Sequence, residues 1–184
     1  MTRRAVFLDR DGTLIEDADY LADPEGIVLI EGAVDALRRL RAEGWLVVIV
    51  TNQSGIARGL ISPEQYRRVA AALEVRLRDA GCPVDATCVC PHHPDISGPC
   101  SCRKPQAGLL VTASRSLSID LSRSFMVGDK VSDVRAGLAA GAASILVRTG
   151  YGLEAETDGA LPSGTPVVDA IGGAVDLILG GESR

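Results

Sequence analysis

The N-terminal part of the chain contains a short run of apolar side chains, Ala5–Leu8, that has no polar face. Such a run is typical of a strand buried on both faces, as the central strands of parallel sheets are. Directly after it, Asp9 and Asp11 stand one residue apart before a Gly12-Thr13 turn. Open α/β sheets bind ligands at the carboxyl ends of their strands, so this segment predicts an acidic site after a central strand. The alternative is an ordinary Asp-Gly turn with two incidental acids.

The rest of the chain alternates between short apolar runs and amphipathic segments with helical periodicity. Strands are predicted at residues 45–50, 85–89, 124–127, 143–147 and 167–168, and helices at residues 32–42, 62–80, 106–117, 131–140 and 170–179. Residues 16–26 predict a flap near the mouth of the site, and residues 154–166 a surface loop. The alternation indicates a doubly wound, Rossmann-like parallel α/β sheet, and we expect residues 1–184 to form a single domain.

The composition argues against several classes of protein. A net charge of −5, scattered arginines and only 3% aromatic residues do not suit a nucleic-acid-binding surface. The apolar run near the N-terminus is too short for a signal peptide, and no segment approaches the length of a membrane span. We therefore expect a cytoplasmic monomer that binds neither nucleic acid nor a membrane, with its five cysteines reduced or metal-bound.

Three of the predicted strands end in polar side chains. Because the carboxyl ends of parallel strands share one edge of the sheet, these side chains should meet there. They are Asp9 and Asp11, Thr51 and Asn52, and Asp129 and Asp133. Mg²⁺ prefers oxygen ligands and takes one or two protein carboxylates, which predicts a magnesium site made by Asp9, the main-chain carbonyl of Asp11 and Asp129. Taken singly, Asp129 could instead cap the next helix, and Asp133 could be a solvated acid in its first turn.

Residues 90–105 form an irregular segment that is too rich in proline and glycine for a regular element. Three thiols and one imidazole in this loop make a suitable set for a tetrahedral zinc ion, and a closed set of four ligands predicts a structural role. The predicted ligands are Cys90, His92, Cys100 and Cys102. His93 and Cys88 are possible substitutes, and Cys82 is expected to be buried. The alternative is a loop with free thiols and a surface histidine.

The pattern Asp-x-Asp-Gly-Thr-Leu after four apolar residues resembles the first motif of the haloacid dehalogenase-like phosphohydrolases. In that family the first acid attacks phosphorus and the second is a general acid and base, which the resemblance assigns to Asp9 and Asp11. Thr51 with Asn52, and Lys104, resemble the motifs that hold the transferring phosphoryl group. The resemblance thus implies a catalytic set of Asp9, Asp11, Thr51 and Lys104 that works with Mg²⁺ through an aspartyl-phosphate. It also implies anionic surroundings that keep Asp11 protonated at first.

Residues 90–105, called the zinc loop below, end at Arg103-Lys104-Pro105. This loop narrows the resemblance to one branch of the family, the histidinol-phosphate and D-glycero-D-manno-heptose 1,7-bisphosphate phosphatases. Members of this branch are small single domains with loops in place of a large cap. The implied substrate contacts are Asp17, Ala18, Asp19, Tyr20, Thr51, Asn52, Gln53, Ser54, Arg103, Lys104 and Lys130. The sequence departs from the branch at residues 14–16, where Leu-Ile-Glu replaces the more usual Ile-Asn.

The implied activity is removal of the C7 phosphate of the heptose bisphosphate, a step toward heptose precursors of cell-surface carbohydrate. Arg103 beside Lys104 favours this substrate, because one phosphate does not require two cations and adjacent residues of an extended loop point apart. The alternatives are a histidinol-phosphate phosphatase, a non-enzymatic receiver-like switch with a phosphorylated aspartate, and a zinc-dependent interaction module. A receiver would not need a leaving-group acid at Asp11, and an interaction module would leave Asp9 and Asp129 unexplained.

Overall fold

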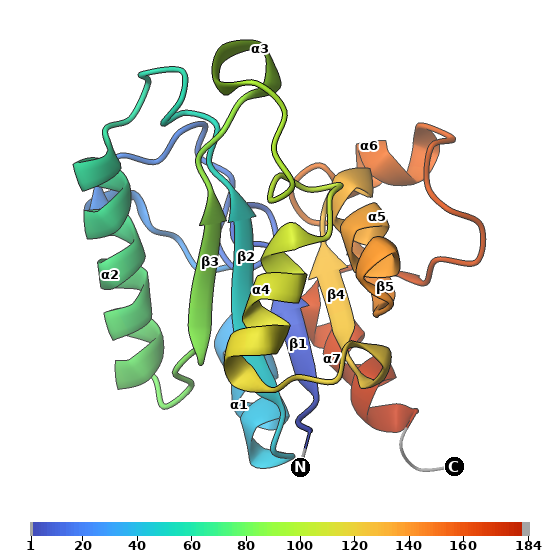
Figure 1. The fold of residues 1–184 in the computed structure, drawn as a ribbon. Helices are drawn as coiled ribbons and strands as arrows, with labels where there is room; N and C mark the ends of the chain where they lie inside the picture. The colour runs from blue at the N-terminus through green and yellow to red at the C-terminus, as the bar shows by residue number, and fades with distance from the viewer. Residues whose placement is uncertain (1, 182–184) are drawn as a thin grey trace.

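The computed structural model describes residues 2–181, and within them six strands form one parallel sheet (Figure 1). The strand order is β3-β2-β1-β4-β5-β6. The strands are β1 (Ala5–Leu8), β2 (Leu46–Asn52), β3 (Ala86–Cys90), β4 (Phe125–Gly128), β5 (Ala143–Val147) and β6 (Val167–Val168). The predicted doubly wound α/β fold is confirmed. The two ends of the predicted domain, residue 1 and residues 182–184, lie outside the described part.

Strand β1 is central, as its lack of a polar face predicts. It pairs with β2 from Ala5 opposite Leu46 onward, and with β4 from Val6 opposite Phe125 onward. All of its side chains are fully buried. The carboxyl end of β1 therefore opens in the middle of the sheet edge, between the ends of β2 and β4.

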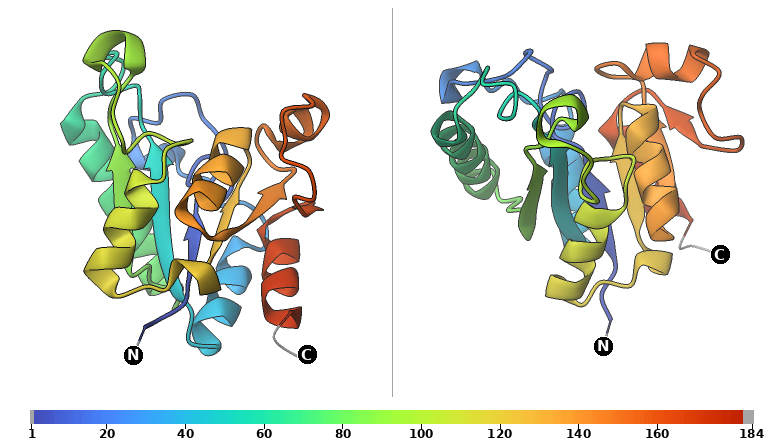
Figure 2. Two further views of the ribbon diagram at one scale, coloured as in Figure 1. Left: turned by 45° about the vertical axis from the view of Figure 1, so that its right-hand side comes forward. Right: turned by 45° about the horizontal axis from the view of Figure 1, so that its top comes forward.

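Helices cover both faces of the sheet (Figure 2). One face carries α1 (Ala33–Ala42), α2 (Pro63–Asp79) and α7 (Ile171–Gly180), and the other carries α4 (Gly108–Leu117) and α5 (Val131–Ala140). Alternate residues of β1 divide between the two cores: Val6 and Leu8 pack on the first face, and Ala5 and Phe7 on the second. The described residues also contain two single-turn 3₁₀ helices, η1 (Pro24–Gly26) and η2 (Leu121–Arg123).

Helix α2 begins after the capping residue Ser62, within the range predicted from the sequence. Ser62 Oγ accepts a hydrogen bond from the Gln65 amide (3.1 Å), and Gln65 Oε1 accepts one from the Ser62 amide (2.7 Å). This reciprocal capping box satisfies two main-chain donors at the helix start, and loss of such a cap costs about 1 kcal/mol. Pro63, in the first helical position, fixes the backbone there. The cap positions the helix that carries Tyr66 behind the candidate site.

Two expectations about loops are wrong in part. Residues 158–166 form the expected loop, but residues 154–157 belong to helix α6 (Gly152–Thr157), in which Ala155 packs against Val134 of α5 and Leu146 of β5. Only one apolar side chain anchors this helix, and one is too few to produce a helical repeat of apolar residues in the sequence. The proline-rich zinc loop also contains a helical turn, α3 (Pro94–Ser97), in which the fixed backbone angle of the first proline suits the start of a helix.

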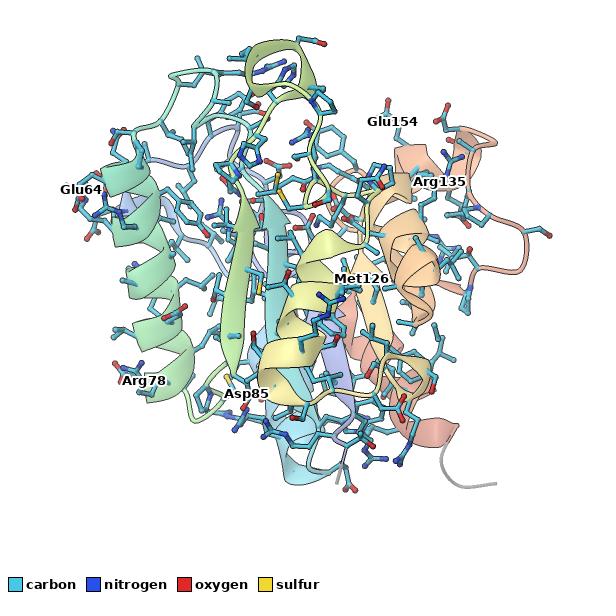
Figure 3. All side chains as sticks on the ribbon, in the orientation of Figure 1. Glu64, Arg78, Asp85, Met126, Arg135 and Glu154 are labelled. Atoms are coloured by element: carbon cyan, nitrogen blue, oxygen red, sulfur yellow. The ribbon has the colours of Figure 1, made fainter. Side chains whose placement is uncertain are left out.

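The strand arrows of β2, β3 and β4 point toward the edge of the sheet where α3 and the flap lie (Figure 1). Charged side chains such as Glu64 and Arg78 of α2 and Arg135 of α5 lie on the outer faces of their helices, while Met126 of β4 is fully buried (Figure 3). Among the described helices, none has both the length and the apolar character needed to cross a bilayer. The polar groups at the carboxyl edge of the sheet are therefore set on a well-packed core.

Candidate active site

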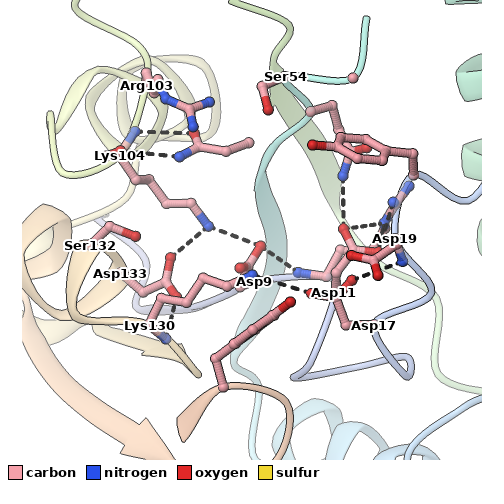
Figure 4. Close-up of a pocket in the computed structure, with 16 residues that line it drawn as sticks. Asp9, Asp11, Asp17, Asp19, Ser54, Arg103, Lys104, Lys130, Ser132 and Asp133 are labelled. Carbon is pink, nitrogen blue, oxygen red and sulfur yellow. Dashed lines mark hydrogen bonds and ion pairs between the residues drawn. The ribbon is translucent and has the colours of Figure 1, made fainter. Parts of the chain in front are cut away.

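A cavity of about 370 Å³ opens at the carboxyl edge of the sheet (Figure 4). It is lined by Asp9, Arg10, Asp11, Asp17, Asp19, Tyr20, Asn52, Gln53, Ser54, Gly55, Arg103, Lys104, Lys130, Ser132, Asp133 and Tyr151. The ends of β1 and β2, the flap, the zinc loop and the segments after β4 and β5 all contribute. The convergence of polar strand ends predicted from the sequence is thus present in the structure.

Asp9 extends the ladder of β1, because its amide donates a hydrogen bond to the Val127 carbonyl (3.0 Å). Its carboxylate accepts hydrogen bonds from the Arg10 amide (2.7 Å) and from the Lys104 ammonium (2.9 Å) at the same oxygen, Oδ1. Only 5% of the residue is exposed. Asp9 is therefore a fixed carboxylate at the floor of the cavity. A substrate can reach it only from the cavity side.

Lys104 reaches the floor of the cavity from the end of the zinc loop. Its ammonium lies 2.9 Å from Asp9 Oδ1 and 2.7 Å from Asp133 Oδ1, and it donates to the Val50 carbonyl at 2.8 Å. Burial alone would lower the pKa of Lys104, but the two carboxylates raise it above its usual value. The side chain is thus a buried, permanent cation between two acids.

The carboxylates of Asp9, Asp129 and Asp133 offer oxygens that lie within 4.8 Å of one another. Asp129 is completely buried; its Oδ2 accepts a hydrogen bond from the Tyr151 amide (2.9 Å), while Oδ1 has no hydrogen-bond partner among the described residues. Burial and the neighbouring Asp9 raise the pKa of Asp129 to about 7. A buried oxygen without a partner, beside a second carboxylate, is the environment that a hard divalent cation stabilises, so these residues fit Mg²⁺.

The Gly12 turn brings the chain close to this acidic group. Gly12 has a φ of +78°, and a Cβ at this position would overlap the carboxylate of Asp129. A Cβ at Gly150 would overlap the same carboxylate oxygen and the main chain of Gly12. Both positions therefore need glycine to let the main chain approach Asp129.

The two alternatives for the second acidic pair are wrong. The N-cap of α5 is Lys130 and not Asp129, and its amide donates to Asp133 Oδ2 (2.9 Å). Asp133 is not a solvated acid, because it is fully buried and pairs with Lys104. The strand-to-helix turn thus directs Asp129 into the acidic group and leaves Asp133 to hold the helix start and the lysine together.

Asp11 points away from the acidic group. Arg10 donates to its carboxylate from Nε (3.1 Å to each oxygen) and Nη2 (2.8 Å to Oδ1), and Gln53 donates to Oδ2 (2.7 Å). The charged group in direct contact with Asp11 is therefore the guanidinium of Arg10, and the expectation that the anionic cavity keeps Asp11 protonated at first stays a prediction. The main-chain carbonyl of Asp11 as a magnesium ligand stays a prediction.

The outer part of the cavity brings together most of the predicted substrate contacts. The Lys130 ammonium lies 3.3 Å from Asp17 Oδ2 of the flap, and the Arg103 guanidinium donates to the His92 carbonyl (3.1 Å). Ala18 and Thr51 do not line the cavity: Ala18 is exposed, and the buried Thr51 hydroxyl accepts a hydrogen bond from Gln53 (2.9 Å). Their contacts with substrate stay predictions.

Five lining residues were not singled out as contacts from the sequence: Arg10, Gly55, Ser132, Asp133 and Tyr151. Arg10 lies between the two acids of the first motif, and Tyr151 follows the carboxyl end of β5, so position alone could have indicated both. Lys130 Nζ lies 4.6 Å from the centre of the Tyr151 ring, which places an aromatic face beside the cation at the cavity mouth.

The four predicted zinc ligands form a compact group. Cys102 Sγ lies 3.2 Å from Cys90 Sγ, 3.5 Å from Cys100 Sγ and 3.3 Å from His92 Nδ1. Ligands about 2.3 Å from a tetrahedral zinc are roughly 3.8 Å apart, so the group needs little expansion to hold the ion. Cys88 and His93 lie outside the group, and Cys82 is buried as expected.

Comparisons with known proteins agree with this geometry. Residues 6–93 match a family model described as haloacid dehalogenase-like hydrolase, and residues 101–174 match a second model described as HAD-hydrolase-like. A D-glycero-beta-D-manno-heptose-1,7-bisphosphate 7-phosphatase from Yersinia pestis is 44% identical over 162 residues, which cover 85% of this chain and 86% of that protein. The chain belongs to the haloacid dehalogenase-like hydrolase family. The resemblance to this family, recognised from the pattern around Asp9 and Asp11, is confirmed.

Two further relatives extend the match. The enzyme of the same name from Escherichia coli K12 is 40% identical over 162 residues, or 85% of each chain. A crystal structure of D,D-heptose 1,7-bisphosphate phosphatase from B. bronchiseptica, complexed with magnesium and phosphate, superposes with a TM-score of 0.89. It is 35% identical and covers 97% of this chain and 99% of that chain. The similarity to this branch therefore spans the sheet, the flap and the zinc loop together.

Proposed function

We propose that this chain is a Mg²⁺-dependent phosphatase that removes the C7 phosphate from D-glycero-β-D-manno-heptose 1,7-bisphosphate. The observation that carries the proposal is the pairing of the buried Asp9–Lys104–Asp133 group with a second, separate set of cations, Arg103 and Lys130, in one cavity. The names of the relatives at 40–44% identity support the same substrate.

Asp9 is the proposed nucleophile. Its carboxylate attacks phosphorus and forms an aspartyl-phosphate, which divides one difficult displacement into two easier ones. The Lys104 ammonium, held against Asp9 at 2.9 Å, neutralises the oxygens of the phosphoryl group during both displacements. Asp133 keeps this ammonium in place, and Thr51 and Asn52 hold the end of β2 beside it.

Asp11 is the proposed proton carrier. In the first step it gives a proton to the sugar oxygen that leaves, and in the second it takes a proton from the water that attacks the aspartyl-phosphate. Its carboxylate lies next to Gln53 at the wall of the cavity and not in the acidic group, which suits a residue that meets the leaving oxygen.

Two metal ions are proposed, with different tasks. Asp9, Asp129 and the Asp11 carbonyl would hold Mg²⁺, which when bound supplies positive charge to the phosphoryl oxygens. Cys90, His92, Cys100 and Cys102 would hold a structural Zn²⁺. The zinc loop continues directly into Arg103 and Lys104, so its conformation sets the positions of two working cations.

The outer part of the cavity would bind the rest of the sugar. Arg103 presents a planar fork with five donors, which matches a second phosphate, and Lys130 adds charge on the opposite segment. Burial alone would lower the pKa of Lys130, but Asp129 and Asp9 keep it well above the usual range, so this cation persists at any physiological pH. The flap residues Asp17, Asp19 and Tyr20 would accept hydrogen bonds from sugar hydroxyls.

The substrate is tested by steady-state kinetics on three compounds: the heptose 1,7-bisphosphate, a heptose 7-phosphate and histidinol phosphate. We expect kcat/KM to be highest for the bisphosphate. Arg103→Ala should lower kcat/KM for the bisphosphate by roughly ten- to a thousandfold, because a charge-assisted contact is lost. The same variant should change an aryl phosphate much less. A preference for histidinol phosphate would assign the acidic flap to a cationic substrate and overturn the proposal.

We also propose the domain organisation, the oligomeric state and the cell compartment of the enzyme. We infer that residues 1–184 act as one catalytic domain and as a monomer, since the cavity is lined by segments of a single sheet. The thiols of the zinc loop must be reduced to bind the ion, which suits the cytoplasm. No role for nucleic acid or a membrane is proposed.

A further inference from the structure

Arg10 is a buried cation that the proposed chemistry does not use. It lies between the two acids of the first motif, and only 2% of it is exposed. Its carbonyl accepts hydrogen bonds from the amides of Leu14 (2.9 Å) and Ile15 (3.0 Å), so the turn after β1 fixes the backbone from which the side chain departs. A buried charge is costly unless it is paired, so this arginine needs an explanation.

The partner of Arg10 is Asp11. The guanidinium donates from Nε at 3.1 Å to both carboxylate oxygens and from Nη2 at 2.8 Å to Oδ1. Gln53 supplies a further donor at 2.7 Å to Oδ2, and it is itself held at 2.9 Å to the Thr51 hydroxyl. A planar fork and an amide, arriving from different directions, fix the plane of the carboxylate as well as its position.

Helix α2 closes the space behind the guanidinium. Arg10 Cζ lies 5.9 Å from the centre of the Tyr66 ring, and Tyr66 is itself buried. Burial raises the pKa of Tyr66 to about 12 despite the opposing charge of Arg10, so the phenol stays neutral.

Arg10 Nη1 has no hydrogen-bond partner among the described residues. A geometry that leaves a buried donor unpaired is not optimised for stability alone.

The two acids of the first motif thus have separate cations. Asp9 pairs with the ammonium of Lys104, which is shared with Asp133, whereas Asp11 pairs with the planar guanidinium of Arg10. This division keeps the Asp11 carboxylate out of the group formed by Asp9, Asp129 and Asp133.

We propose that Arg10 is a positioning residue that holds the Asp11 carboxylate toward the leaving oxygen of the substrate. The inference rests on the proposed function, in which Asp11 carries the proton. Proton transfer requires donor and acceptor at hydrogen-bond distance, and a misplacement of about 1 Å can cost a hundredfold in rate. Arg10 therefore acts on the step in which the sugar oxygen departs, and not on the binding of the sugar.

The test compares Arg10→Lys with the wild type on two substrates, the heptose bisphosphate and 4-nitrophenyl phosphate. This variant keeps the positive charge but loses the planar guanidinium and its parallel donors. We expect kcat for the bisphosphate to fall by roughly ten- to a hundredfold with little change in KM. For the aryl phosphate, whose leaving group needs no proton, kcat should change less than about threefold. Equal losses on both substrates, or no loss on either, would overturn the inference.

Arg41→Lys is the matched control. Arg41 also forms an ion pair with an aspartate, Asp85 (2.9 Å), but at the amino end of the sheet and outside the cavity lining, so its variant should leave kcat unchanged on both substrates. Should Arg10→Lys fail to fold, Tyr66→Leu carries the same test, because it removes the ring behind the guanidinium. The same selective loss on the bisphosphate is expected, and an equal loss on both substrates would contradict it.

Asp11→Asn in the same assay separates this inference from the proposed function. If Asp11→Asn loses much more activity on the bisphosphate than on the aryl phosphate while Arg10→Lys does not, Asp11 keeps its role and the inference about Arg10 is wrong. If Asp11→Asn itself affects both substrates equally, the proton-carrying role of Asp11 is wrong, and the inference falls with it.

Discussion

Asn52 and Lys104 are joined by two reciprocal hydrogen bonds: the Asn52 side-chain amide donates to the Lys104 carbonyl (3.0 Å), and the Lys104 amide donates to Asn52 Oδ1 (3.1 Å). The contact ties the end of β2 to the end of the zinc loop. The main chain of Lys104, which follows an irregular loop, is thereby bonded to a residue of the sheet. The direction of the Lys104 side chain into the acidic group depends on this junction and on the loop before it.

We predict that Asn52→Ala loosens this junction. The Lys104 amide and carbonyl lose their partners, which should lower the free energy of unfolding by about 1–3 kcal/mol. The value of kcat should fall on every phosphate ester, since Lys104 faces Asp9 in each case. Urea denaturation and kinetics on the heptose bisphosphate measure the two effects. Wild-type kinetics in Asn52→Ala would contradict the prediction.

Zinc should be stoichiometric with the chain and separable from magnesium. Cys100→Ser, or removal of zinc by a strong chelator, should loosen the loop and lower activity through misplacement of Arg103 and Lys104. Added Mg²⁺ should not restore it. Metal analysis of the purified protein, alongside kinetics before and after chelation, provides the measurement. Cys82→Ser, in a buried cysteine outside the metal group, is the control. Full activity in a zinc-free preparation would refute a structural zinc.

Magnesium affinity should increase with pH. Burial and Asp9 raise the pKa of Asp129 from 3.8 to about 7 in the metal-free protein, and the ion binds the deprotonated form. Below pH 7 the dissociation constant for Mg²⁺ should therefore rise by about tenfold per pH unit, and above it the constant should level off. Calorimetric titration across this range tests the prediction, and a constant affinity from about pH 5 to 8 would contradict it.

The raised pKa of Asp129 should make the stability of the metal-free protein depend on pH in the opposite direction. Between pH of about 4 and 7 the native state holds a proton on Asp129 that the unfolded chain has lost, so this group makes stability decrease as the pH rises through that window. Saturating Mg²⁺ should offset the loss. Thermal unfolding with and without the ion measures the difference, and Asp129→Asn, which cannot titrate, should reduce its pH dependence.

The sequence predicted the parts of the fold and site that short-range patterns determine. The apolar run before Asp9 identified the central strand, and the polar ends of three strands identified the site edge, because these features depend on chain neighbours alone. The strand order and the pairing of Lys104 with Asp133 could not be predicted, since both depend on contacts between distant segments. Arg10 was visible in the motif, but its burial against Tyr66 depends on how α2 packs.

Asp9→Asn tests phosphoryl transfer through Asp9 most directly. The amide cannot attack phosphorus, so turnover of the heptose bisphosphate should fall below about one hundredth of the wild-type rate, because loss of a covalent route costs several kcal/mol in the barrier. The variant should keep the fold, as judged by circular dichroism and thermal unfolding. Steady-state phosphate release by the folded variant is the decisive measurement: a rate below one hundredth is expected, and a higher rate would show that Asp9 is not the nucleophile.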